Sequence, residues 1–204
     1  MSNKSEKAKI NLPNKLTILR MILVPVFIIL MAVAQYFKMP NMRFVACFVF
    51  VFAAVTDFID GYLSRKNNQV TTFGKVMDPL ADKLLVSSGF IMLTGLGHIP
   101  AIFTAIIILR DFLINAFRMF GSDKGVVIPA AWSGKVKTAS QLTGLTVAIL
   151  DTNAYGAFLT TNITGVALVI NVLATILITI AVLATIYSCI DYTKALGKYI
   201  DPTK

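Results

Sequence analysis

Charged residues are scarce in this chain, and hydrophobic residues are abundant. Only 14% of the 204 residues are charged and 56% are hydrophobic, whereas a soluble domain usually carries about 25% charged residues. The apolar runs approach the roughly 20 residues that cross a bilayer, and they lie near residues 16–37, 43–64, 77–97, 99–120, 133–151 and 163–190. The sequence therefore predicts an all-α polytopic membrane protein with six transmembrane helices.

Cysteine and histidine are also nearly absent. The chain has two cysteines and one histidine, which gives neither a disulfide framework nor the ligand spacing of a zinc site. Cys47 and Cys189 lie within apolar runs, where isolated thiols usually behave as small hydrophobic side chains. His98 falls between two predicted spans, and we expect it to be an outer-loop residue without chemistry.

Positive charge is present, and its distribution is one-sided. The formal net charge is +9, but all Lys and Arg residues except Lys38 and Arg43 belong to one side of the predicted spans and the helix halves next to it. The positive-inside rule places both termini in the cytosol. Because membrane topology accounts for the positive charge, we expect no nucleic-acid partner. The lysine-rich segment 1–12 is predicted to lie along the anionic cytoplasmic leaflet, ahead of one membrane domain over residues 13–204.

Several predicted spans are polar in their cytosolic half. The polar stretches are "TDFIDGYLSR", "MDPLADK", "RDFLINAFR" and "WSGKVKTASQ". Charged residues at membrane depth face a protein interior or a water-filled cavity, so these helices predict one polar cavity open to the cytosol. The alternative is snorkelling of long side chains at helix ends. It accounts for Lys66 and Lys194 but not for Asp57, Arg110 and Arg118, which have apolar sequence on both sides.

Four aspartates stand where the second predicted span ends and the third begins. Asp57 and Asp60 share a stripe of the second span, and Asp78 and Asp82 lie one turn apart on the third. Clustered carboxylates raise one another's pKa unless cations sit among them, and we identify no other adequate counter-charge in the sequence. Mg²⁺ or Mn²⁺ fits oxygen ligands of this kind, and two ions about 4 Å apart would suit a displacement at phosphorus.

The connection between these two spans is predicted to be short. The segment from Arg65 to Gly74 ends in "TTFG", which is typical of a turn-like loop. Pro79 is expected in the first turn of the third helix, where proline is tolerated. A loop of this length would pair the two helices antiparallel, so that their carboxylates converge.

The spacing over residues 57–82 is recognisable. It reads D-x2-D-G-x2-S-R, eight residues, then G-x3-D-x3-D. This resembles the signature of the CDP-alcohol phosphatidyltransferases, D-x2-D-G-x2-A-R-x8-G-x3-D-x3-D. The one departure is Ser64, which stands where alanine is usual and is a small-for-small change. The six-span layout extends the resemblance to nearly the whole chain.

The resemblance implies roles for these positions. The metal ligands would be Asp57, Asp60, Asp78 and Asp82. Asp82 would also be the catalytic general base on the acceptor hydroxyl. The nucleotide and diphosphate would be bound at Gly61, Ser64, Arg65 and Gly74. A glycine lets a ligand approach the backbone closely, and the planar guanidinium of Arg65 matches phosphate oxygens. A C2 homodimer is expected from the habit of the family and from base rates.

Other interpretations of the aspartates are a set of intramembrane ion pairs with nearby Arg and Lys, and a cation transporter that uses the carboxylates as its binding site. A UbiA-type prenyltransferase also uses Asp-rich helix ends and magnesium. That family would have more spans and an N-D-x2-D pattern, and neither is present in the sequence.

Four Lys and Arg residues outside the aspartate pattern indicate the charge of the acceptor substrate. The cytosolic halves of the fourth and fifth spans carry Arg110, Arg118, Lys135 and Lys137. Asp111 is expected to partner only one of them, so the rest indicate an acceptor with an anionic headgroup. The stretches "NLPNKLTILRMILVP", "LRDFLINAFR" and "GKVKT" also resemble the family members that make phosphatidylglycerophosphate in the bacterial inner membrane.

That closer resemblance implies the substrates. The primary hydroxyl of sn-glycerol 3-phosphate would attack the lipid-linked phosphorus of CDP-diacylglycerol, and CMP would leave. Asn14, Thr17 and Arg20 would lie over the diphosphate as part of the first helix. The alternative for these three residues is a polar helix start with Arg20 among the lipid headgroups. The other acceptors to weigh are inositol phosphate and serine.

Overall fold

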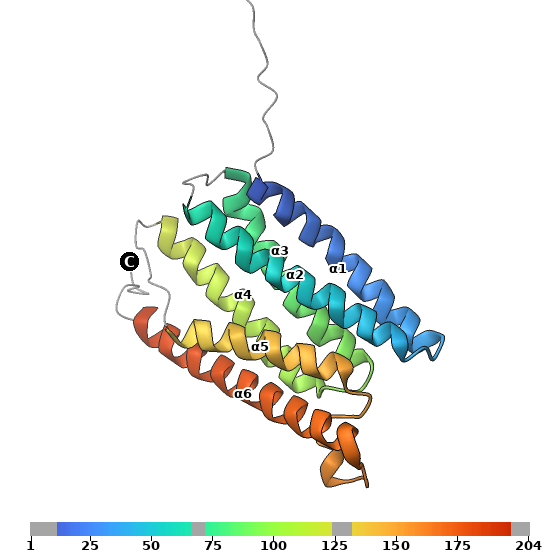
Figure 1. The fold of residues 1–204 in the computed structure, drawn as a ribbon. Helices are drawn as coiled ribbons and strands as arrows, with labels where there is room; N and C mark the ends of the chain where they lie inside the picture. Colours follow the sequence, from blue (N-terminus) through green and yellow to red (C-terminus); the bar gives the residue numbers. More distant parts are fainter. Residues whose placement is uncertain (1–11, 67–71, 124–131, 197–204) are drawn as a thin grey trace, which may run out of the picture.

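The computed structural model describes residues 12–66, 72–123 and 132–196, which form a bundle of long helices (Figure 1). The elements are α1 (Leu12–Tyr36), α2 (Asn41–Lys66), α3 (Thr72–Gly95), α4 (Ala101–Asp123), α5 (Trp132–Leu150), the short 3-10 helix η1 (Ala157–Leu159) and α6 (Gly165–Leu196). The described residues contain no strand. The prediction of an all-α fold with six long helices is confirmed.

Successive helices run in alternating directions, so the connections gather at two opposite ends (Figure 1). The beginning of α1 and the end of α6 lie at one end, together with the ends of α2 and α4 and the beginnings of α3 and α5. We call this the terminal end. The α1–α2, α3–α4 and α5–α6 connections lie at the other end, which we call the hairpin end. The predicted alternation of the connections is therefore confirmed for the described residues.

The centre of the bundle is apolar. α1 packs against α2 and α3, α5 packs against α6, and α4 contacts α3 and α6. The rings of Phe27 and Phe50, both fully buried, lie 5.4 Å apart between their centroids. Phe90 and Leu145 extend the same core to α3 and α5. Large buried side chains of this kind make many dispersion contacts between neighbouring helices.

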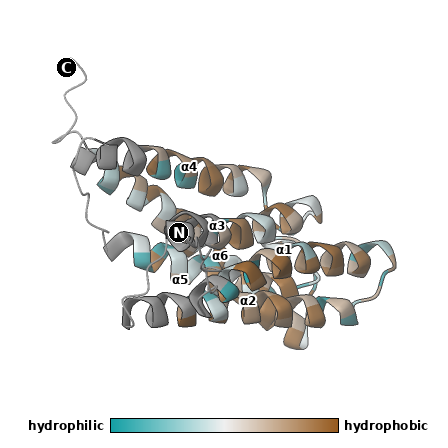
Figure 2. Cartoon of the chain, turned by 90° about the horizontal axis from the view of Figure 1, so that it is seen from above, coloured by the Kyte–Doolittle hydropathy of each residue, from teal (hydrophilic) through white to brown (hydrophobic). Residues whose placement is uncertain are grey.

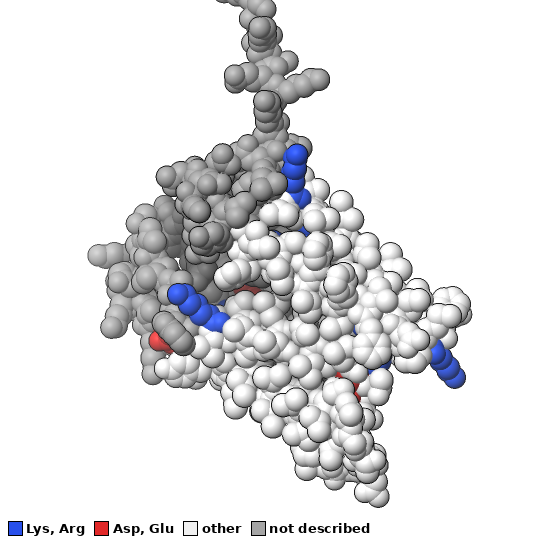
Figure 3. Space-filling view, in the orientation of Figure 1, with Lys and Arg blue, Asp and Glu red and all other residues white. Residues whose placement is uncertain are grey.

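The outer surface is apolar as well. Phe48, Phe58, Phe112 and Leu183 are each at least 60% exposed, and the face in Figure 3 is mostly uncharged. Hydrophobic colours predominate over α1 and α2 in Figure 2. The helical segments long and apolar enough to span a bilayer by length and composition are Lys15–Tyr36, Asn41–Ile59 and Gly165–Thr193, among the described residues. Large apolar side chains outside as well as inside indicate a surface covered by lipid.

The helix α3 begins earlier than the sequence predicts. It starts at Thr72, so Thr72, Phe73 and Gly74 are helical, and the expectation of a turn-like "TTFG" loop is wrong for these residues. Pro79 accordingly lies inside α3, and its expected place in the first turn is also wrong. A proline inside a helix removes one backbone hydrogen bond. Membrane helices tolerate this because neighbouring groups can satisfy the freed carbonyl.

Two glycines permit close helix contacts in this core. A Cβ at Gly144 would lie 3.1 Å from Ile178 Cδ1 and 3.3 Å from the carbonyl carbon of Leu177, so α5 and α6 meet almost backbone to backbone there. A Cβ at Gly89 would lie 3.1 Å from Leu145 Cδ1, a side chain that can rotate. The approach at Gly144 is less adaptable, because one of its neighbours is backbone.

Gly144→Ala is therefore expected to destabilise the bundle by about 1–3 kcal/mol through overpacking. The measurement is the thermal unfolding midpoint of the purified protein in detergent. Gly134→Ala is the matched control, because it lies on the same helix and a Cβ there meets nothing within 4 Å. Equal midpoints for the two variants would contradict close packing of α5 against α6.

Candidate active site

Buried polar side chains line the half of the bundle nearest the terminal end. They are Thr17, Arg20, Thr56, Lys137, Ser140, Gln141, Thr185 and Ser188, all at most 8% exposed. They come from α1, α2, α5 and α6, and the apolar core lies beyond them toward the hairpin end. A polar interior in this half agrees with the polar helix halves of the sequence. The predicted cavity itself involves side chains outside the described part and stays a prediction.

An ion pair joins the first two helices in this polar half. Arg20 Nη1 lies 2.5 Å from Asp57 Oδ1, and the two side chains are 0% and 38% exposed. Thr17, about one turn earlier on α1, is also fully buried. Arg20 is thus inside the bundle, which excludes the alternative that places it among the lipid headgroups. The expectation that the aspartates lack any other adequate counter-charge is wrong for Asp57, because Arg20 supplies one.

For the other residues of the aspartate pattern, the structure shows only the helix on which each one lies. Asp60, Gly61, Ser64 and Arg65 lie on α2, and Gly74, Asp78 and Asp82 lie on α3. Asn14 is on α1 and Arg118 is on α4. The side chains of all these residues lie outside the described part of the structure. Because α2 contacts α3, the backbone brings the two halves of the pattern onto neighbouring helices, and convergence of the carboxylates stays a prediction.

Metal binding is not tested by the side chains that the structure does describe. Among them, no group of three or more His, Cys, Asp or Glu residues could hold a metal ion. Of the four aspartates in the pattern, only Asp57 has a described side chain. It is partly exposed and carries hard oxygen donors, which fits Mg²⁺ or Mn²⁺.

A second charged cluster connects α4, α5 and α6. Asp111 Oδ1 accepts hydrogen bonds from Arg110 Nη1, at 3.0 Å, and from Lys137 Nζ. Arg110 Nη2 donates to Ser188 Oγ. The expectation that Asp111 partners only one cation is therefore wrong, because one carboxylate oxygen can accept from two donors. Lys135 is exposed near the start of α5.

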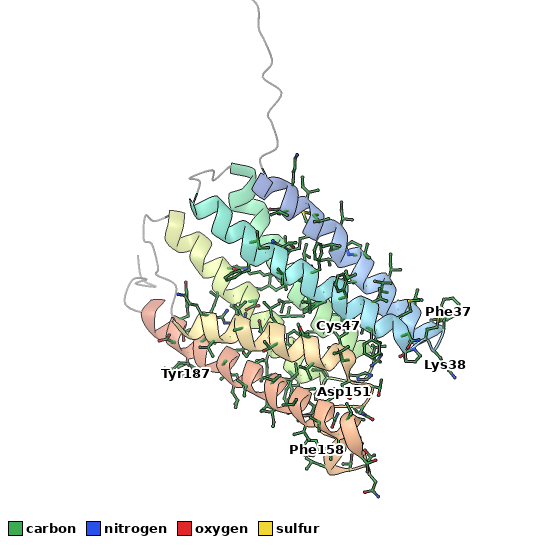
Figure 4. The ribbon with its side chains drawn as sticks, viewed as in Figure 1. Phe37, Lys38, Cys47, Asp151, Phe158 and Tyr187 are labelled. Carbon is green, nitrogen blue, oxygen red and sulfur yellow. The ribbon has the colours of Figure 1, made fainter. Side chains whose placement is uncertain are left out.

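A third polar cluster closes the hairpin end, and sequence reasoning missed it. Arg43 Nη1 donates to the backbone oxygen of Asp151, and Arg43 Nη2 lies 3.0 Å from His98 Nε2. Asn171 Nδ2 donates to Asp151 Oδ2 at 2.7 Å. Figure 4 shows Asp151 at the same end as Lys38 and Phe158. The sequence contained one indication of this cluster. An Arg, a His and an Asp lie beside three different loops on the side of the membrane that is otherwise poor in charge.

A tight turn puts His98 into this cluster. Gly97 has φ 75°, and the His98 N–H then donates to Leu93 O at 2.8 Å. Positive φ costs glycine little, so the chain can reverse directly after α3. The adjacent pocket, lined by residues that include His98, Asp151 and Tyr155, has a volume of about 10 Å³. That is about the room one water molecule needs.

The environment of His98 disfavours its charged form. Burial lowers the pKa of His98, and the neighbouring charge of Arg43 lowers it further, while Asp151 and the backbone of Asn153 act in the opposite direction. An arginine side chain can only donate hydrogen bonds, so His98 Nε2 must accept from Arg43 and carry no proton. His98 lies in the α3–α4 connection, as expected, and its contact with Arg43 is structural.

Comparison with known proteins identifies similar sequences. The family model of the CDP-alcohol phosphatidyltransferases matches residues 10–187. A CDP-diacylglycerol–glycerol-3-phosphate 3-phosphatidyltransferase of Rickettsia felis is 36% identical over 93% of this chain and 97% of the relative. Proteins of the same name from Bacillus subtilis and Haemophilus influenzae are 38% and 35% identical, over 69% and 95% of this chain and 77% and 97% of the relatives.

The lowered pKa of His98 predicts a pH dependence of stability. Below about pH 6.5, the ordinary value, the unfolded chain takes up a proton that the folded chain resists. The free energy of unfolding should therefore fall as the pH drops from 7 toward 5. Because the chain has one histidine, His98→Gln should flatten this part of the curve. Thermal unfolding between pH 5 and 8 tests this, and equal slopes for both proteins would contradict it.

Proposed function

This chain belongs to the CDP-alcohol phosphatidyltransferase family, and on that premise we propose that it transfers the phosphatidyl group of CDP-diacylglycerol to sn-glycerol 3-phosphate. The products are phosphatidylglycerophosphate and CMP. The observation that carries the proposal is the similarity, over 93% of the chain, to a relative named for this reaction. The complete D-x2-D-G-x2-S-R-x8-G-x3-D-x3-D spacing supports it.

The reaction is a displacement at the lipid-linked phosphorus. The primary hydroxyl oxygen of glycerol 3-phosphate forms a new bond to phosphorus, and the bond from phosphorus to the CMP oxygen breaks. Asp82 accepts the hydroxyl proton, as its position in the pattern implies. Arg65 binds the diphosphate, since a planar guanidinium donates to two oxygens at once. Arg20 and Thr17 approach the same region from α1, where both are fully buried.

The four aspartates suit a divalent cation. Asp57, Asp60, Asp78 and Asp82 lie on contacting helices, and they would hold Mg²⁺ or Mn²⁺ with their carboxylate oxygens. The bound metal would neutralise negative charge on the diphosphate. Arg20 keeps Asp57 compensated by a protein cation, which lowers the electrostatic cost of gathering the carboxylates.

The acceptor phosphate is assigned to the cations of α4 and α5. Arg110 and Lys137 meet at Asp111 in the polar half of the bundle. Lys135 lies on the same helix as Lys137, and Arg118 lies further along α4. A neutral acceptor would need none of these charges, whereas a phosphate matches arginine and lysine donors.

The proposed location is the bacterial inner membrane, with the terminal end and the active site in the cytosol. The asymmetry of Lys and Arg supports this orientation. The protein is proposed to act as a homodimer, which is the commonest symmetric assembly.

The proposed function is tested by comparing several acceptor substrates. Purified protein receives CDP-diacylglycerol, Mg²⁺ and, in separate reactions, glycerol 3-phosphate, inositol phosphate, serine or glycerol, and CMP release is measured. Glycerol 3-phosphate should give by far the highest kcat/KM, because the phosphate pocket has no partner in serine or glycerol. A higher kcat/KM for serine or inositol phosphate would overturn the proposed acceptor while leaving the family intact.

Asp82→Asn should lower kcat by about 10²–10⁴-fold, the usual contribution of a general base. CDP-diacylglycerol binding should persist, because the amide oxygen can still contact a metal. Near wild-type turnover of Asp82→Asn with an unchanged pH profile would assign the base to another residue.

EDTA should abolish turnover in the wild type, and Mg²⁺ or Mn²⁺ should restore it.

Cysteine labelling tests the orientation. In a background with Cys47→Ala and Cys189→Ala, a cysteine replaces either Lys15, exposed at the terminal end, or Thr160, exposed at the hairpin end. An impermeant maleimide should label Thr160→Cys in intact cells and Lys15→Cys only after the membrane is opened. The reverse pattern would invert the proposed topology.

A further inference from the structure

The α4–α5–α6 cluster holds two cations in a fixed arrangement. Arg110 donates through Nη1 to Asp111 and through Nη2 to Ser188, while Lys137 donates to the same oxygen of Asp111. The side chains of Arg110, Asp111 and Lys137 are only 11%, 12% and 6% exposed. Ser188 is fully buried. The four side chains therefore form one buried unit across three helices.

The arrangement restricts side chains that are otherwise flexible. Arginine and lysine each carry about 2 kcal/mol of rotamer entropy, and burial of their charges is costly without hydrogen-bonded partners. Asp111 fixes both cationic heads with one oxygen. Ser188 fixes the second nitrogen of Arg110 from α6, a helix that is apolar around most of its circumference. The group on α6 thus orients a charge on α4.

The cluster also keeps donor capacity. A guanidinium has five N–H donors, and the hydrogen bonds of Arg110 to Asp111 and Ser188 use its two terminal nitrogens. Its Nε is buried and has no hydrogen-bond partner among the described residues. A buried donor left in this state costs free energy, and an anion bound beside Arg110 would relieve that cost.

We propose that Asp111 and Ser188 are positioning residues that hold Arg110 and Lys137 for the phosphate of the acceptor, and so determine the preference for a phosphorylated acceptor. The inference rests on the proposed function, which assigns the acceptor phosphate to Arg110 and Lys137. Neither Asp111 nor Ser188 needs to touch the acceptor. Asp111 is negatively charged and would repel it, so its contribution is the geometry of the two cations.

The repulsion gives the proposal a distinctive consequence. If the cluster worked by net charge alone, Asp111→Asn would add positive charge and tighten phosphate binding. If it works by position, Asp111→Asn replaces two charge-assisted hydrogen bonds with weaker neutral ones. Both cationic heads are then held less firmly, and phosphate binding weakens despite the added charge. The sign of the change in the acceptor KM therefore separates the two mechanisms.

The experiment measures CMP release by the full-length purified protein, with glycerol 3-phosphate varied at saturating CDP-diacylglycerol and the reverse. Asp111→Asn should raise the acceptor KM about 10-fold, and Ser188→Ala by severalfold, as expected for the loss of one or two oriented charge-assisted bonds. The KM for CDP-diacylglycerol should stay within about twofold, since its diphosphate binds elsewhere. Asp111→Glu, which keeps the carboxylate, and Ser188→Thr, which keeps the hydroxyl, should recover most of the acceptor affinity.

Thr193→Ala is the control for α6, because Thr193 is exposed and its hydroxyl bonds only to carbonyls of its own helix. A fall in kcat with both KM values unchanged, in parallel with a lower unfolding midpoint, would show a merely structural role and overturn the proposal. A lower acceptor KM in Asp111→Asn would also overturn it. If Asp111→Asn does not fold, Ser188→Ala decides the matter, because it removes no charge.

Failure of the positioning role can be distinguished from failure of the proposed function. If the wild type uses another phosphorylated acceptor, the proposed function fails, and the same variants measured with that acceptor decide the positioning role. If the wild type uses only an unphosphorylated acceptor, both proposals fail.

Discussion

Charge burial inside an apolar bundle is the constraint on which the rest of this structure depends. The outside of the helices is covered with large apolar side chains such as Phe48 and Phe112, so a charge at membrane depth, away from the helix ends, has to turn inward. An inward charge then needs a partner on another helix, because an isolated buried charge is far too costly. Arg20 on α1 and Asp57 on α2 meet this requirement across one helix contact. Asp111 meets it for α4 and α5 by accepting from Arg110 and Lys137.

The two ends of the bundle satisfy that constraint differently. At the hairpin end, Arg43 contacts both His98 and Asp151 from a different connection, and the pocket beside them is about large enough for one water molecule. At the terminal end, the buried polar groups are spread over several helices, and Asp57 remains partly exposed. A tightly bonded end and a polar end suit an enzyme that admits water-soluble substrates from one side only. The proposed cytosolic entry of glycerol 3-phosphate follows this difference.

The same constraint connects stability with chemistry. In the proposed reaction a phosphate and a diphosphate would bring negative charge into the polar half, and the cations proposed to bind them are already held by carboxylates. Arg20 is held by Asp57, and Arg110 and Lys137 are held by Asp111. Such pre-organised cations lose little conformational freedom when substrate binds, which favours both affinity and orientation. Carboxylates outside the direct reach of the acceptor can in this way influence which acceptor is used.

The sequence by itself determined the helical membrane class, the number of long helices, the alternation of their connections and the family. Each depends on properties that are local along the chain. These are the length of the apolar runs, the loops in which Lys and Arg are concentrated, and the fixed spacing from Asp57 to Asp82. It did not determine the early start of α3 at Thr72, because glycine and proline are weak boundaries where neighbouring helices satisfy the backbone. Only the tertiary structure decided that Arg20 meets Asp57, that Asp111 serves two cations and that His98 joins Arg43. Arg20 and Asp57, Arg43 and His98, and Asp111 and Lys137 are far apart in the chain. Which of these side chains meet depends on how the helices pack, as they do at Gly144 against α6.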